Sequence, residues 1–241
     1  MKGGEVSEHE LRVFDSVGET AREAARALAD AARRAVDQRG RFSLALAGGT
    51  TPRKTYEAFA ELADVPWGAI DFYFGDERAV PRDDLESNYR LCRESLFDRQ
   101  SIEEACIFRM AGDADDLEAA ARDYEAILPS ALDLVLLGMG EDGHTASIFP
   151  GSPAFSEPDR RVMVVTGPKP PPKRLTLTPR VFESARAVIV LVTGSGKAPA
   201  LARALEGPTD ATALPIQIVK NRTFLVDRAA ASKLASAREQ V

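Results

Sequence analysis

The chain has 241 residues, 44% of them hydrophobic and 28% charged, which is ordinary for a soluble globular protein with one large α/β domain or two small ones. Its formal net charge of −6 gives no general attraction to nucleic acid or to an anionic membrane, so a few local cations would have to bind any anionic substrate. The two cysteines are too few for a disulfide framework or a zinc site, and no apolar stretch suits a spanning helix or a signal peptide, so we expect a cytoplasmic protein.

Short apolar runs alternate with amphipathic, often Ala-rich stretches along the chain. The expected strands cover residues 11–14, 42–47, 70–74, 132–137, 161–166, 174–178, 187–192, 216–219 and 223–226. The expected helices cover residues 16–39, 51–62, 88–97, 115–128, about 198–205, and the C-terminal end. Repeated strand–loop–helix units predict an α/β fold with a mostly parallel sheet covered by helices. Because no long linker interrupts residues 1–241, we expect a single domain.

Two of these helices begin with capping signals. Ser16 followed by Glu19 has the spacing of a capping box, and Gly40 stops the same helix. Thr51 before Pro52 is typical of an N-cap followed by the first helical residue.

Four glycine-bearing loops follow strands of the expected sheet: GGTTP at 48–52, GDER at 75–78, GMGEDGH at 138–144 and GSGK at 194–197. Ligands of such sheets bind beyond the carboxyl ends of the strands, so these loops should share one rim. A glycine after a strand often serves only to let the backbone turn. Four such loops that carry His, Asp, Arg and Lys together favour a binding site.

The loop at 138–144 has two interpretations. Its three glycines have the G-x-G-x-x-G spacing of a dinucleotide-binding loop. That motif needs a helix after the third glycine, whereas Pro150 follows Gly143 by seven residues and leaves room for barely one turn. We therefore expect the glycines to shape a tight loop that presents Asp142 and His144.

His144 is one of two histidines, and a neutral imidazole can take a proton from water near neutral pH. Asp142 could accept a hydrogen bond from the imidazole and fix its tautomer, or stand beside it as a second anion. A structural histidine at a helix start is the alternative, but the flanking glycines and the preceding buried strand favour catalysis. His9, in a polar N-terminal segment, is expected at the surface.

The GDER loop would add both acidic and basic side chains to this rim of the sheet. Arg78 could neutralise a carboxylate, a phosphate or a developing oxyanion, and Asp76 could orient a water, a hydroxyl or the histidine. Taken alone, the segment is equally typical of a surface charge cluster.

Two loops suit a phosphate group. Free N–H groups and the helix dipole at a helix N-terminus favour an anion, and here the donors would come from Gly48, Gly49, Thr50 and Thr51. GSGK is not a nucleotide P-loop, because Leu191 and Ala198 stand where that motif needs Gly and Ser or Thr. Lys197 still suits one phosphate, and Arg174 is a further cation on an expected strand.

The sequence contains no HExxH, no Cys/His cluster and no G-x-S-x-G nucleophile motif. The remaining groups fit proton transfer or hydrolysis on a small phosphorylated substrate, with no metal and no cofactor.

Five segments resemble the glucosamine-6-phosphate isomerase/6-phosphogluconolactonase family, and they occur in the family's order: LALAGGTTPRKTYEAF, FYFGDERAVPRDDLESNYRL, DLVLLGMGEDGHTASIFPG, PPPKRLTLTPRVFESA and VTGSGKAPAL. They span about residues 42–205. The resemblance, which is closest to the lactonase branch, implies a three-layer α/β fold with a Rossmann-like parallel sheet. It implies hydrolysis of 6-phospho-D-glucono-1,5-lactone to 6-phosphogluconate, the second step of the oxidative pentose phosphate pathway.

The resemblance also implies roles for the residues named above. His144 would be the general base that activates water, with Arg78 stabilising the oxyanion or holding the substrate. Asp76 and Asp142 would orient His144, the water or sugar hydroxyls. The 6-phosphate would be held by Gly48, Gly49, Thr50, Thr51, Arg174 and Lys197. Asn88, in the SNYR run, is a weaker candidate for substrate binding.

Two other functions remain open. Glucosamine-6-phosphate deamination occurs in the same family, but its members carry a DEY-type sequence where GDER stands here. A catalytically silent sugar-phosphate sensor is the other alternative, although no helix-turn-helix segment or basic patch supports it.

Overall fold

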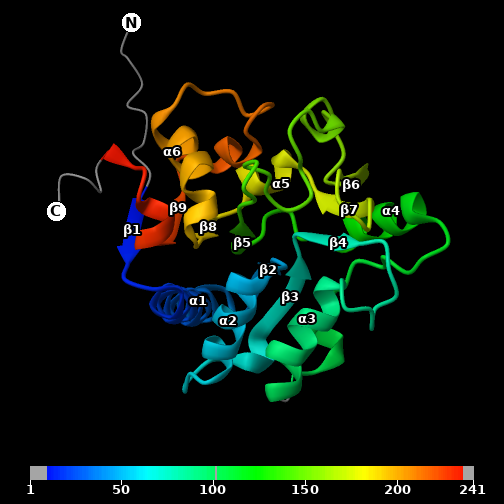
Figure 1. The fold of residues 1–241 in the computed structure, drawn as a ribbon. Helices are drawn as coiled ribbons and strands as arrows, with labels where there is room; N and C mark the ends of the chain where they lie inside the picture. The colour runs from blue at the N-terminus through cyan, green and yellow to red at the C-terminus, as the bar shows by residue number, and fades with distance from the viewer. Residues whose placement is uncertain (1–9, 101, 236–241) are drawn as a thin grey trace, which may run out of the picture.

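A six-stranded parallel sheet forms the centre of the molecule in a computed structural model that describes residues 10–100 and 102–235 (Figure 1). Its strands are β1 (Glu10–Phe14), β2 (Phe42–Leu46), β3 (Ile70–Phe74), β5 (Leu134–Gly138), β8 (Ala187–Val192) and β9 (Thr223–Asp227). They lie in the order β1-β9-β8-β5-β2-β3, and every neighbouring pair is parallel. The expected parallel sheet is confirmed.

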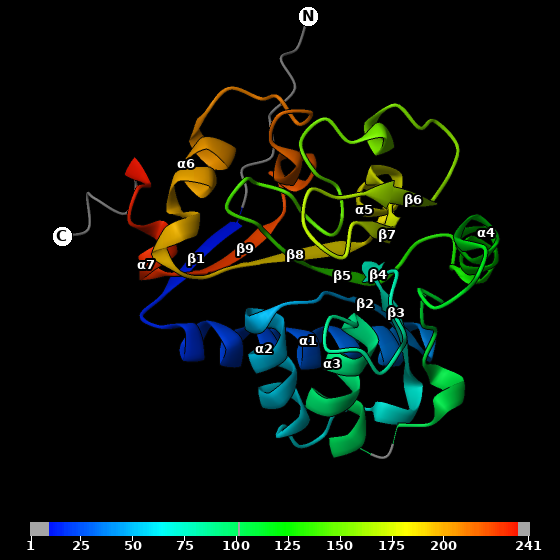
Figure 2. The same ribbon diagram turned by 45° about the vertical axis from the view of Figure 1, so that its right-hand side comes forward.

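Helices cover both faces of this sheet and complete three layers (Figure 2). One face carries α1 (Val17–Arg39), α2 (Thr50–Ala60) and α3 (Asn88–Ser95). The other face carries α5 (Pro179–Ser184) and α6 (Ala198–Glu206). Two further helices are α4 (Leu117–Ile127), which packs on β6, and the short α7 (Arg228–Ala231). Short 3-10 helices, labelled η, occupy Trp67–Ala69, Phe97–Arg99, Glu104–Cys106, Pro153–Phe155, Ser195–Lys197 and Pro215–Val219.

A second, antiparallel sheet stands at one end of the large one and consists of β4 (Asp76–Arg78), β7 (Lys173–Leu177) and β6 (Val162–Thr166). The sequence predicts a loop for GDER, and this is wrong, because its last three residues form β4 against β7. Such a short charged strand carries no alternating apolar pattern that could reveal it. The strand matters for function because it fixes the direction of the Asp76 and Arg78 side chains.

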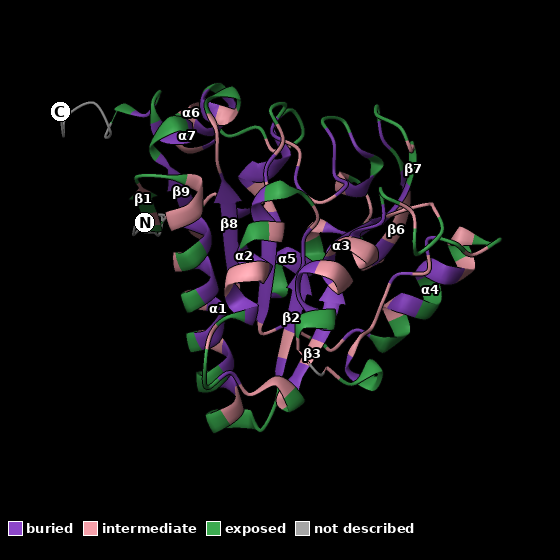
Figure 3. Ribbon diagram, turned by 60° about the horizontal axis from the view of Figure 1, so that its bottom comes forward, coloured by how far each residue is buried: buried purple, intermediate pink, exposed green. Residues whose placement is uncertain are grey.

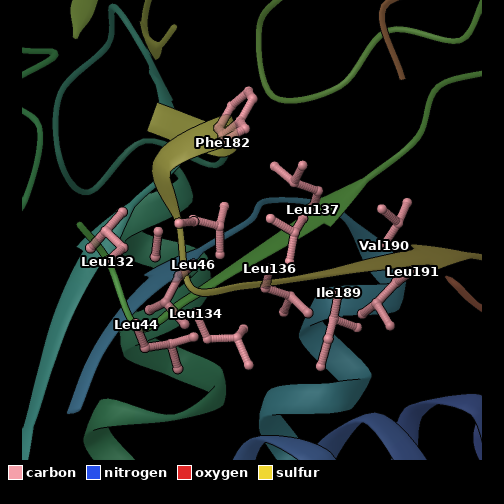
Figure 4. Close-up of a cluster of buried hydrophobic side chains, with 14 of the residues drawn as sticks. Leu44, Leu46, Leu132, Leu134, Leu136, Leu137, Phe182, Ile189, Val190 and Leu191 are labelled. Atoms are coloured by element: carbon pink, nitrogen blue, oxygen red, sulfur yellow. The ribbon is translucent and has the colours of Figure 1, made fainter. Parts of the chain in front are cut away.

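The core lies on both faces of β2, β5 and β8, whose residues are almost entirely buried (Figure 3). Strands buried on both faces read as continuous apolar runs, as the segments 132–137 and 187–192 do. Figure 4 shows the resulting alternation, with Leu137 and Val190 pointing toward the side of Phe182, and Leu136 and Ile189 pointing to the opposite side.

Capping explains where the first helices begin. Ser16 caps α1 as expected, because its Oγ accepts a hydrogen bond from the Glu19 N–H at 3.2 Å. The predicted Thr51 cap of α2 is wrong: Gly49 occupies the N-cap position with φ +108, which glycine adopts without strain. The Thr51 hydroxyl instead lies 2.6 Å from that of Thr193.

The predicted strand at 216–219 is also wrong, since this segment belongs to the 3-10 helix at Pro215–Val219. Its Gln217 side chain is buried and donates to three backbone carbonyl groups, of Arg203, Ala204 and Pro208. Periodicity alone does not separate a short apolar strand from such a turn. The other expected helices and strands before the C-terminal end are present with ends shifted by a few residues. At that end the structure describes only the short α7, and residues 236–241, which the expected C-terminal helix includes, lie outside the described residues. The single-domain expectation stays a prediction.

Candidate active site

The loops after β2, β3, β5 and β8 meet at the carboxyl edge of the large sheet, where the chain's path across the sheet reverses between β2 and β5. They line a cleft whose empty space, part of it open to solvent, is about 760 Å³. The predicted site residues in its wall are Gly48, Gly49, Thr50, Thr51, Asp76, Arg78, His144, Arg174 and Lys197. Asp142 and Asn88 are outside this wall and contact residues within it.

The β5 loop fixes the imidazole of His144. Its Nδ1 lies 2.5 Å from Oδ1 of Asp142, and the same oxygen accepts the His144 backbone N–H at 3.1 Å. A carboxylate only accepts hydrogen bonds, so Nδ1 carries the proton and Nε2 is left as the acceptor of the neutral ring. Burial opposes ionisation of Asp142, but the hydrogen bonds from the backbone and the ring of His144 favour the carboxylate, and the pKa of Asp142 lies below its usual value.

Glycines make room for these side chains. A Cβ on Gly140 would lie 2.1 Å from Nδ1 of His144, so only glycine allows the ring to sit there. A Cβ on Gly48 would lie 1.9 Å from Oδ1 of Asn88. Gly143 has φ +80 and would meet Leu214 at 2.2 Å. Within this loop, Gly140 therefore makes room for the His144 ring, and Gly143 allows a tight turn packed on Leu214.

A buried hydrogen-bond network orients Asp76. Ser147 donates its hydroxyl to Oδ2 of Asp76 at 2.6 Å, and Asn88 donates its amide to Oδ1 at 3.1 Å and to the backbone oxygen at 2.8 Å. Ser147 reaches inward because Ala146 bends the chain with φ +48. Asn88 is only 1% exposed, so the structure places it behind Asp76 rather than in the cleft wall.

Glu77 ties the GDER segment to α3. Its carboxylate accepts the backbone N–H groups of Asn88 and Tyr89, and the hydroxyl of Ser87. Burial raises the pKa of Glu77, although these N–H groups and that of Arg78 oppose the rise. Glu77 thus anchors the start of α3 and, through it, the amide that holds Asp76.

The opposite part of the cleft is built from the β2 and β8 loops. The hydrogen bond between Thr51 and Thr193 joins the start of α2 to the segment that precedes Lys197. Asp227, at the end of β9, accepts the Gly194 N–H at 3.0 Å and so holds the GSGK loop. Burial lowers the pKa of Lys197, while the charges of Glu141 and Asp227 oppose this. The start of α2 and Lys197 thus supply the free N–H groups and the positive charge that suit an anion, and we call this part the candidate anion-binding end of the cleft.

The model of the glucosamine-6-phosphate isomerases/6-phosphogluconolactonase family matches residues 15–227. The chain belongs to this family. It is 38% identical to the 6-phosphogluconolactonase of Synechocystis over 203 residues, 80% of this chain and 83% of that one. It is also 38% identical to the Mycobacterium tuberculosis 6-phosphogluconolactonase over 219 residues, 84% of this chain and 89% of that one. The resemblance seen in the motifs is confirmed, and these relatives support the expected hydrolase.

Solved structures show the same fold in both branches of the family. The 6-phosphogluconolactonase of Trypanosoma brucei superposes with a TM-score of 0.83 at 30% identity, covering 95% of this chain and 99% of that one. A monomeric glucosamine-6-phosphate deaminase superposes equally well, with a TM-score of 0.83 at 27% identity, covering 93% of this chain and 99% of that one. Fold similarity therefore does not separate the two activities, and the residues of the cleft must do so.

The sequence analysis does not identify three supporting residues of the site. Ser147 holds Asp76, Glu77 holds the start of α3, and Asp227 holds the GSGK loop. Ser147 stands in the quoted GHTAS run, but nothing local shows that its hydroxyl points at a residue 71 positions away. His9 lies outside the described residues.

Over residues 10–100 and 102–235, no group of three or more His, Cys, Asp or Glu side chains is placed to hold a metal ion. None of the helices in those ranges is both long enough and apolar enough to cross a membrane.

Proposed function

We propose that this chain hydrolyses 6-phospho-D-glucono-1,5-lactone to 6-phospho-D-gluconate, the second step of the oxidative pentose phosphate pathway. The observation that carries the proposal is the Asp142–His144 pair, which presents an unprotonated Nε2 in a cleft that also contains the anion-binding end at α2 and Lys197. The activity of the relatives named 6-phosphogluconolactonase supports the same reaction.

The two ends of the cleft suggest how the lactone binds. The 6-phosphate lies at the start of α2, where Gly48, Gly49, Thr50 and Thr51 offer N–H and hydroxyl donors, and Lys197 supplies a positive charge. The lactone ring then extends toward His144 and Arg78. Binding of the remote phosphate positions the carbonyl carbon for attack, which is how binding energy is converted into rate.

Hydrolysis then proceeds through a tetrahedral intermediate. His144 Nε2 takes a proton from a water, whose oxygen bonds to C1 of the lactone, and the carbonyl oxygen becomes an oxyanion next to Arg78. The C1–O5 bond breaks, and the imidazolium returns its proton to O5, which becomes the C5 hydroxyl. The new carboxylic acid loses its proton to solvent. Asp142 keeps the imidazole in the required tautomer, and Asp76 orients the water or a sugar hydroxyl.

The size of the expected contributions is adequate. A positioned general base accelerates such a reaction by roughly 10²–10⁴-fold, and an oxyanion donor by roughly 10²–10³-fold. Because a lactone is an activated ester, the mechanism needs neither a covalent intermediate nor a metal, cofactor or nucleic acid. The proposal includes a cytoplasmic location.

The test is a rapid assay with freshly generated lactone, corrected for spontaneous ring opening. His144→Ala should lower kcat by at least about 100-fold, while His9→Ala, at the other histidine of the sequence, should leave it unchanged. Dialysis against EDTA should leave turnover intact. Near-normal turnover by a folded His144→Ala protein would remove His144 from the mechanism.

Glucosamine-6-phosphate deamination is the competing activity, because a deaminase shares this fold. Ammonia release from glucosamine 6-phosphate distinguishes it directly. Tight binding of sugar phosphates with turnover of neither substrate would instead indicate a sensor.

A further inference from the structure

The imidazole of His144 needs more than its hydrogen bond to hold a single orientation. Its Nδ1 lies 2.5 Å from Oδ1 of Asp142, which fixes the position of that atom. One such bond still lets the ring tilt, because the χ2 angle of a histidine has broad energy wells. The contact with Asp142 therefore does not by itself determine where Nε2 points.

The ring of Phe149 supplies a second contact. Its centre lies 4.7 Å from the centre of the His144 ring, and the two planes are inclined by 37°. This distance lies at the short end of the roughly 4.5–7 Å range that is favourable for aromatic pairs. Phe149 thus packs against the imidazole and limits its tilt.

A tight turn returns the chain from His144 to Phe149. Thr145 and Ile148 exchange backbone hydrogen bonds, with N···O distances of 3.4 Å and 2.9 Å. Ala146, between them, bends the backbone with φ +48. Because of this turn, two rings that are five positions apart in the sequence lie side by side on one short segment.

The chain behind Phe149 keeps its ring in place. Phe149 is only 6% exposed. A Cβ on Gly167 would lie 2.6 Å from Cε2 and 2.9 Å from Cζ of Phe149, so the backbone of Gly167 packs closely on the edge of this ring. The Gly167 N–H donates to the Pro172 oxygen at 2.7 Å, which closes the Pro-rich loop. Phe149 is therefore supported by backbone rather than by a flexible side chain.

Phe149 has no direct part in the chemistry. His144 lines the cleft, whereas Phe149 and Asp142 line a second hollow. The Phe149 side chain has no group that exchanges a proton, so any effect on the reaction passes through a neighbour. One such neighbour is His144, and another is Arg174, whose guanidinium carbon lies 5.6 Å from the ring centre. The first would affect the rate of the chemical step, and the second the binding of an anion.

We propose that Phe149 is a positioning residue, whose ring holds the His144 imidazole so that Nδ1–H stays on Asp142 and Nε2 faces the attacking water. This inference rests on the proposed function. Without the Phe149 ring, the imidazole tilts, and Nε2 faces the water for a smaller fraction of the time. Attack tolerates little misplacement, since a displacement of about 1 Å costs on the order of 100-fold in rate. The β2 and β8 loops, which suit the phosphate, do not depend on this contact.

The kinetic test is Phe149→Leu, which keeps an apolar side chain but removes the flat ring. Its kcat for fresh lactone should fall about 10-fold, while its Kd for 6-phosphogluconate, measured by calorimetry, should stay within about threefold of wild type. Phe155→Leu is the matched control, because Phe155 also packs on the core but lies outside the cleft wall. Its kcat should not change. Weaker binding by Phe149→Leu with a wild-type kcat would overturn the proposal and assign Phe149 to the support of Arg174.

Nuclear magnetic resonance tests the orientation of the ring without turnover. His9→Ala leaves one histidine in the chain, so both nitrogen signals of an isotopically labelled protein belong to His144. The neutral ring should show a protonated Nδ1 and an unprotonated Nε2. Adding Phe149→Leu should shift both signals toward those of mixed tautomers, and adding Phe155→Leu should not. Unshifted signals in the Phe149→Leu protein would overturn the proposal, whatever its kcat.

If Phe149→Leu does not fold, Gly167→Ala displaces the same ring from behind. The added Cβ must push Cε2 of Phe149 away by about 0.4 Å or more to reach a separation of 3.0 Å. The kcat should then fall severalfold and the His144 signals should shift, and a wild-type value of either would overturn the proposal. A wild-type protein without lactonase activity would instead refute the proposed function, while the His144 signals would still test the packing.

Discussion

Gly140→Ala should damage catalysis by displacing one imidazole. The added Cβ would lie 2.1 Å from Nδ1 and 2.2 Å from Cε1 of His144, and 2.7 Å from Oδ1 of Asp142. Real Cβ atoms essentially never approach another atom within 3.0 Å, so the ring must move by about 0.9 Å or more. A displacement of about 1 Å costs on the order of 100-fold in rate, because attack requires a narrow geometry. We therefore expect kcat to fall about 100-fold.

The assay is steady-state hydrolysis of fresh lactone, together with thermal unfolding of each variant. Gly138→Ala is the matched control, because a Cβ there has no other atom within 4 Å and leaves the base in place. Its kcat should stay within a few-fold of wild type, with any effect falling on KM. Wild-type kcat in Gly140→Ala would show that the position of this imidazole does not control the rate. Equal losses of kcat in both variants would also refute the reasoning.

Three further outcomes follow from the same geometry. Ser147→Ala removes the 2.6 Å hydrogen bond to Asp76, so kcat should fall about 10-fold; an unchanged kcat with lowered stability would make Ser147 purely structural. Burial lowers the pKa of Lys197, and only the charged amine attracts phosphate. Affinity for 6-phosphogluconate should therefore fall as the pH rises, and the fall should begin at a lower pH than it would for an exposed lysine. Lys197→Arg should shift that loss to higher pH, and identical titrations of both proteins would contradict the assignment. Arg174→Met removes a buried cation that faces Arg78 and makes no ion pair within residues 10–100 and 102–235, so it should raise the free energy of unfolding by about 1 kcal/mol in urea. A clear loss of stability would argue against repulsion in the free enzyme.

The large sheet could be predicted because its signals are local. Apolar runs mark β5 and β8, and a Ser-x-x-Glu spacing marks the start of α1. The rule that ligands bind beyond the carboxyl ends of parallel strands then places four loops on one rim without knowledge of the strand order. The contact between Asp142 and His144 in the GMGEDGH loop is predictable for the same reason, since the two residues are only two positions apart.

The small sheet and its consequences could not be predicted this way. The β4–β7 pairing joins residues about 100 positions apart, and nothing in GDER indicates a strand. Without that register, Arg174 appears as an isolated cation, and the sequence gives no reason to place it beside Arg78. The contacts of Ser147 and Glu77 depend on the same long-range arrangement, so they emerge only when β4 and α3 are in place.

The distribution of charge in the cleft separates two substrates that the fold alone does not distinguish. Glucosamine 6-phosphate carries an ammonium group close to the carbon that reacts, whereas the lactone is neutral there and becomes a carboxylate. Two arginines that face each other in the cleft wall would repel the amine and attract the developing anion. Asp76 offsets this only in part, because one carboxylate stands beside two guanidinium groups in the cleft wall. The β4–β7 register therefore supports the proposed lactone hydrolysis over deamination, even though a deaminase shares the surrounding fold.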